Sequence, residues 1–129
     1  MICKDIYDAA LKLIDDPCTD SERSDDYEER APYLIAAFCS ENGVIDKNYR
    51  RFSGGEEQGH FSAVYISLAD DFPLSERFFS PAVNYLASML IVEENPELSD
   101  KLFARCCDTV SALYGELPLM TSKIKNKYF

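Results

Sequence analysis

The sequence has few of the groups from which catalytic sites are built. Its only histidine, His60, borders a glycine-rich stretch, and no motif supports a Cys-His nucleophilic pair with Cys106 or Cys107. Gly54 and Gly55 lack the G-x-x-x-x-G-K-[ST] spacing that holds phosphates. Adjacent carboxylates, as in Asp15-Asp16, diverge on a helix or strand and rarely share one ligand. We therefore expect neither enzymatic activity nor a cofactor or metal.

The number and spacing of the cysteines do not indicate a fold that is held together by disulfide bonds. The chain has five cysteines, an odd number, and no C-x-x-C pair. This pattern indicates neither a disulfide framework nor a zinc site. Cys39 and Cys106 fall on apolar helical stripes, where a free thiol behaves as a small hydrophobic group. We expect reduced, structural thiols.

Long apolar runs are also missing. None approaches the roughly 20 residues that span a bilayer, and Asp5 and Asp8 interrupt the start of the chain where a signal peptide would be apolar. The 129 residues are 47% apolar, which suits a single globular domain. We expect a protein that is made and kept in a cytoplasm.

Basic residues are scarce in the N-terminal quarter. The net charge is -10, and residues 1–29 hold ten Asp or Glu against Lys4, Lys12 and Arg23. This excess of acid argues against sequence-specific binding of nucleic acid, whose phosphates require Lys and Arg on the contacting face. Two interpretations stay open: a solvated acidic face, or contact with a basic protein surface.

The centre of the predicted fold is a helical hairpin over residues 77–94 and 97–114. The first helix carries apolar residues at helical spacing, with more on a second face, as in a buried helix. Ser80-Pro81 and Asn95-Pro96 each predict an N-cap followed by proline at the first helical position. The second helix has a narrower stripe of Leu98, Leu102, Cys106, Val110 and Leu113.

Two helices are predicted before the hairpin. Residues 2–16 form a short amphipathic helix that Pro17 ends. The second begins with the capping pair Asp25 and Glu28, and we expect Asn42-Gly43 to stop it. The fold class is therefore mainly α, with a four-helix core made of two N-terminal helices and the C-terminal hairpin.

The middle of the chain predicts a small β-hairpin or an extended loop. Residues 53–59 contain three glycines and no apolar residue, which indicates a flexible loop. Residues 60–68 are rich in β-branched and aromatic residues and suit a strand. Its partner is either the segment 44–50, which would give a hairpin, or a strand of another copy.

The C-terminal residues reverse the charge of the chain. We expect one domain over residues 1–129 that ends in an extended basic tail, 121–129. In this tail lysines alternate with other residues at a period of two, which suits an extended segment. We expect a partner interface there, formed by Lys123, Ile124, Lys125, Lys127, Tyr128 and Phe129.

Several stretches resemble one family. Leu11 and Leu13-Ile14, the run Tyr27 to Ile35, the run Phe72 to Phe78, and Glu94 to Leu98 look like the small head-to-tail connectors (neck adaptors) of clostridial-type tailed prophages. The similarity covers most of the chain except residues 46–59. The glycine-rich loop and the lysine tail depart from the better-known members, so no individual site residue carries over.

The resemblance implies a mainly helical, non-enzymatic subunit. Copies would form a ring beneath the portal at the head vertex and join it to the next neck or tail-completion protein. The compact helical pattern, the unpartnered strand and the opposed charges agree with a subunit that assembles head to tail. The alternative is a monomeric cytoplasmic adaptor or regulator that binds one protein through its acidic face. A small hydrolase ranks below both.

Overall fold

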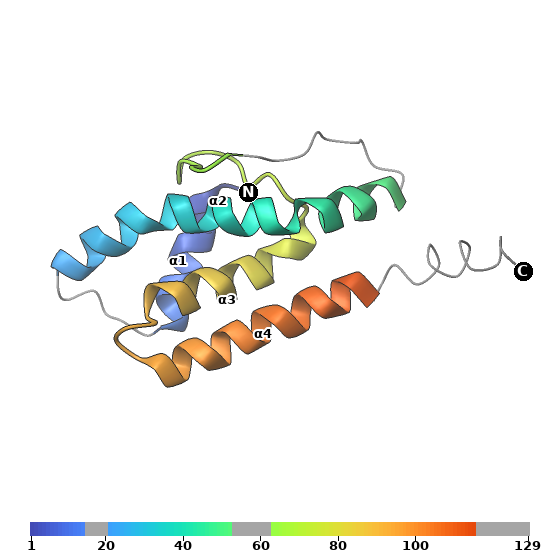
Figure 1. The fold of residues 1–129 in the computed structure, drawn as a ribbon. Coiled ribbons are helices and arrows are strands. Elements are labelled where there is room, and N and C mark those ends of the chain that lie inside the picture. Colours follow the sequence, from blue (N-terminus) through green and yellow to red (C-terminus); the bar gives the residue numbers. More distant parts are fainter. Residues whose placement is uncertain (15–20, 53–62, 116–129) are drawn as a thin grey trace, which may run out of the picture.

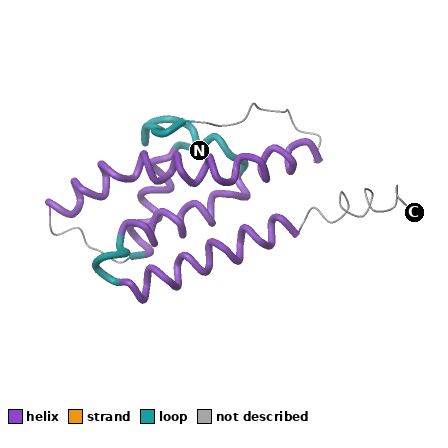
Figure 2. Tube along the Cα trace, in the orientation of Figure 1, coloured by secondary structure: helices purple, strands orange, loops and turns teal. Residues whose placement is uncertain are grey.

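The computed structural model describes residues 1–14, 21–52 and 63–115. The elements in these ranges are α1 (Cys3–Leu13), α2 (Ser21–Phe52), the short 3-10 helix η1 (Glu76–Phe78), α3 (Phe79–Leu90) and α4 (Pro96–Gly115). Figure 1 shows α3 between α2 and α4, and Figure 2 shows that the described residues form helices and connecting loops without a strand. The predicted mainly α class with four helices is confirmed.

Helix α3 is the centre of the molecule. It packs against α1, α2 and α4, and nine of its twelve residues are buried. Leu86, Ala87 and Leu90 have no exposed surface. Because α3 is apolar on nearly every side, burial against three helices removes more of its surface from water than burial against one would.

The predicted start of α4 is confirmed, whereas α3 ends at Leu90 and not at residue 94 as predicted. The Asn95 side chain accepts a hydrogen bond from the Leu98 N–H at 3.2 Å, and Pro96 is the first residue of α4. Across the hairpin, the buried Ser99 hydroxyl donates to the Ser88 carbonyl at 2.8 Å. The predicted cap at Ser80-Pro81 is wrong, because η1 leads directly into α3 at Phe79. Pro81 lies in the first turn, where its missing N–H has no helical partner to lose.

The predicted end of the second helix is wrong as well. Helix α2 runs through Asn42 and Gly43 to Phe52. The Asn42 amide donates to the Phe38 carbonyl at 2.9 Å, which places this turn-forming side chain within the helix. Further on, Asp46 accepts from Arg50 Nε at 2.8 Å and from the Ser75 N–H at 3.0 Å. These contacts stabilise α2 beyond Asn42-Gly43. The helix propensity of single residues is a weak preference, and tertiary contacts override it.

The predicted β-hairpin does not form, since residues 44–50 belong to α2. The part of the predicted strand that the structure describes, 63–68, has no regular structure. The segment 63–75 instead crosses the start of α1. The Cys3 N–H donates to the Asp70 carbonyl and the Lys4 N–H to the Leu68 carbonyl, both at 2.9 Å, and Ile2 forms an isolated antiparallel bridge with Asp71. The extended segment thus supplies acceptors for N–H groups that the first turn of a helix leaves without partners.

Within the described ranges, no helix combines the length and the apolar character needed to cross a membrane. The predicted loop 53–59 and the predicted basic tail 121–129 lie outside the described residues.

Candidate functional site

The interface residues predicted from sequence lie outside the described part of the chain. The range 116–129, which the structure does not describe, contains all six: Lys123, Ile124, Lys125, Lys127, Tyr128 and Phe129. His60 falls in another such range, 53–62. The structure therefore leaves the tail interface a prediction. Cys106 is buried on α4 and Cys107 is exposed beside it.

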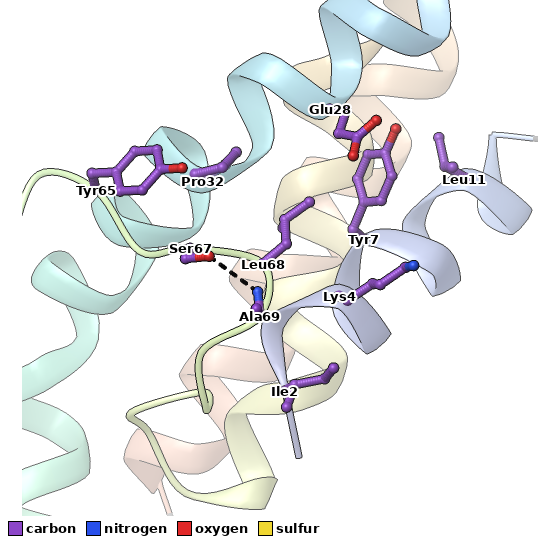
Figure 3. A pocket seen from close by; sticks show the side chains of 10 residues that line it. All are labelled: Ile2, Lys4, Tyr7, Leu11, Glu28, Pro32, Tyr65, Ser67, Leu68 and Ala69. Carbon is purple, nitrogen blue, oxygen red and sulfur yellow. Dashed lines mark hydrogen bonds between the residues drawn. The ribbon is translucent and has the colours of Figure 1, made fainter.

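A surface depression forms a groove between α1, α2 and the segment 65–69 (Figure 3). Its volume is about 680 Å³. Most of its lining is apolar or aromatic: Ile2, Tyr7, Leu11, Pro32, Tyr65, Leu68 and Ala69. The three polar residues of the lining are Lys4, Glu28 and Ser67. We call this depression the α1–α2 groove.

Local backbone bonds hold the segment that forms one wall of the groove. The Ile66 N–H donates to the Pro32 carbonyl of α2 at 3.3 Å, and the Lys4 N–H of α1 donates to the Leu68 carbonyl. The Ala69 N–H donates to the Ser67 hydroxyl at 3.2 Å, as the dashed line in Figure 3 marks. Pro32 lies inside α2, so this bond ties the segment to the backbone of the helix. The groove therefore depends on contacts among three separate segments.

Exposed apolar side chains continue the groove onto the neighbouring surface. Tyr33 and Tyr65 pack edge to face, with ring centroids 5.1 Å apart, yet each is 53% exposed, and Val64 is 79% exposed. We call these three residues the aromatic patch. Contiguous exposed apolar surface of this kind marks sites of protein contact, and tyrosine is enriched in such sites.

The elements around the groove are acidic. Helix α1, residues 25–33 of α2 and residues 63–71 together carry three cations, Lys4, Lys12 and Arg30. The same segments carry eight exposed carboxylates: Asp5, Asp8, Asp25, Asp26, Glu28, Glu29, Asp70 and Asp71. Arg30 is already bound to the Asp26 carboxylate at 3.2 Å and to the Met89 carbonyl at 2.9 Å. The groove thus has a mainly apolar lining that includes one anion, Glu28, and one cation, Lys4. The elements that form it carry an excess of exposed carboxylates.

A second, smaller cleft lies between α2 and α4. Its volume is about 260 Å³, and its lining includes Phe38, Glu41, Tyr85, Phe103 and Cys107. Phe103 is 42% exposed at its edge. The cleft shows that Glu41 of α2 and Cys107 of α4 lie at the same level of the bundle.

The buried thiols have raised pKa values. Burial, with a smaller effect from the Asp70 and Asp71 carboxylates, raises the pKa of Cys3 to about 11. Burial and the neighbouring Cys107 raise the pKa of Cys106 to about 11, and burial raises that of Cys39 further. A thiol of this kind is a poor nucleophile because little thiolate is present at neutral pH. Among the described residues, no group of three or more His, Cys, Asp or Glu side chains is placed to hold a metal ion.

Sequence reasoning missed the α1–α2 groove. One signal was present: Tyr33 lies off the apolar stripe of α2 that contains Tyr27, Ala31 and Leu34, so it points away from the core. Tyr65 lies in the predicted strand 60–68, and nothing in that prediction indicates that its side chain is exposed.

Comparisons of this chain with protein-family models, with curated proteins and with solved structures give no match.

Proposed function

We propose that this chain is a structural subunit of the neck of a tailed phage. Copies form a ring that joins the portal to the next neck or tail-completion protein, first in the bacterial cytoplasm during assembly and then in the virion. The chain acts by binding proteins, with no catalytic step and no cofactor.

The observation that carries this proposal is the exposed aromatic patch beside the α1–α2 groove. Tyr33, Val64 and Tyr65 leave apolar surface in water at a cost that a covering protein surface removes. The resemblance to neck adaptors adds to this support. Its segments include the run Phe72 to Phe78 and the turn Glu94 to Leu98, and these flank the central helix α3.

A second candidate is a monomeric cytoplasmic adaptor that binds one basic protein. The acidic character of α1, residues 25–33 and residues 63–71 favours it, because eight exposed carboxylates against three cations would attract a positive surface. The two functions differ in self-association, which the neck subunit requires and the adaptor does not.

Native mass spectrometry of the full-length chain over a range of concentrations separates the two. We expect one closed oligomer of identical subunits, because heterologous contacts that repeat around an axis close into a ring. A chain that stays monomeric up to its solubility limit would support the adaptor instead.

A further inference from the structure

We propose that the α1–α2 groove of one copy binds residues 122–129 of a second copy. This inference rests on the proposed neck function and names the contact that joins neighbouring subunits. The groove supplies a mainly apolar lining among elements with an excess of negative charge, and the C-terminal residues supply apolar side chains with lysines.

The two surfaces match in chemistry. In an extended chain, alternate side chains point to opposite sides, so Ile124 and Tyr128 share one face while Lys123, Lys125 and Lys127 share the other. Placed in the groove, the first face meets apolar lining such as Leu11 and Leu68. The lysine face then points away from the groove, and the excess of carboxylates on the surrounding elements attracts it at longer range. Exposed ion pairs add little affinity, so the apolar face supplies most of it and the charges set direction and on-rate.

The backbone of the groove wall fits an extended partner. In the described part of the chain, the Tyr65 N–H and carbonyl make no backbone hydrogen bond, whereas the next residue, Ile66, donates its N–H to Pro32 of α2. An extended peptide that lies along residues 64–66 has a free donor and acceptor with which to pair, as in the addition of a strand to an open backbone edge.

Distance favours a second copy over the same copy. Helices α2 and α4 run in the same direction in Figure 1, and Glu41 and Cys107 mark the same level. A helix rises 1.5 Å per residue, so Gly115 lies about 12 Å from Cys107 toward the C-terminal end of α4. Glu28 to Pro32 lie about 14 to 20 Å from Glu41 in the opposite direction, toward the N-terminal end of α2. The separation along the bundle is therefore about 30 Å.

The link from Gly115 to Ile124 has nine residues and spans at most about 32 Å when fully extended. Binding within one copy would thus need a link stretched to its limit. A neighbouring copy meets no such restriction.

The test uses full-length chains with one surface changed at a time. Tyr65→Lys places a cation at the groove, and its matched control, Tyr114→Lys, changes a tyrosine on α4 that is also well exposed. The tail variant carries Ile124→Asp together with Tyr128→Asp. Circular dichroism and the thermal midpoint confirm that each variant is folded. We expect self-association to weaken by at least about tenfold for the groove and tail variants and to stay unchanged for the control.

Mixing the groove variant with the tail variant gives the decisive result in native mass spectrometry. The groove variant keeps an intact tail and the tail variant keeps an intact groove, so one productive contact is restored. We expect a heterodimer in the mixture and no larger species, while each variant alone is monomeric.

The outcomes separate this inference from the proposed function. If Tyr65→Lys and the tail variant assemble like the wild type, the groove contact is overturned and the ring stands on another surface. If each variant alone is monomeric and their mixture stays monomeric, pairing of the groove with the tail of another copy is overturned. If the wild type itself is monomeric at every concentration, both the contact and the ring are overturned.

Discussion

Replacement of Leu86 by alanine is expected to lower the free energy of unfolding by about 2 to 5 kcal/mol. The side chain has no exposed surface and lies in α3, which packs against the other three helices. Its removal loses the transfer free energy of the buried groups and leaves a cavity that rigid neighbours fill only in part.

Urea denaturation, followed by circular dichroism, measures this loss. The matched control is Leu13→Ala, the same change at the last residue of α1, where the side chain is 39% exposed. We expect the control to lose less than about 1 kcal/mol. A loss of that size for Leu86→Ala as well would mean that α3 is not the centre of the core.

Replacement of Asp46 by alanine is expected to cost about 3 kcal/mol of stability. Asp46 is 4% exposed, and its carboxylate accepts from Arg50 Nε and from the Ser75 N–H. Arg50 also donates to the Pro73 carbonyl at 3.1 Å. The change therefore removes the acceptor that joins α2 to the segment leading into η1, and it removes the buried carboxylate that the Arg50 guanidinium contacts.

The chain contains a matched control at the same spacing. Asp26 and Arg30 also form an i, i+4 pair, at 3.2 Å, but both side chains are well exposed. We expect Asp26→Ala to cost about 0 to 1 kcal/mol, as for other surface pairs. Equal losses for the two variants in urea denaturation would show that burial of Asp46 adds nothing.

The helical hairpin could be predicted because its signals are local. The Asn95 side chain accepts a hydrogen bond from the Leu98 N–H, and Pro96 lacks an N–H at a position where a helix has no acceptor for one. Neither effect needs a residue that is distant in the sequence. The apolar character of α3 on nearly every side likewise indicated burial before any partner was known.

The length of α2 could not be predicted, because the contact that extends it is not local. Asn42 and Gly43 are a sound stop signal by themselves, yet Asp46 bonds to Ser75, 29 positions later in the sequence. Once α2 takes residues 44–50, the predicted strand loses its partner within the chain. The segment 63–75 then pairs with the N-terminus instead.

The α1–α2 groove was beyond sequence reasoning for a similar reason. Its lining comes from three segments, and the Ile66 to Pro32 and Lys4 to Leu68 backbone bonds that join them carry no side-chain signature. The tail interface was predicted from charge and alternation, and it stays a prediction because its residues lie outside the described ranges.

The most direct test of the neck proposal is electron microscopy of the full-length chain co-expressed with the portal protein of the phage to which the proposal assigns it. We expect the two proteins to purify together, with a ring of this chain at one end of the portal and the symmetry axis shared between them. Recovery of the portal without this chain, while the chain elutes as a folded monomer, would contradict the proposal and favour the monomeric adaptor.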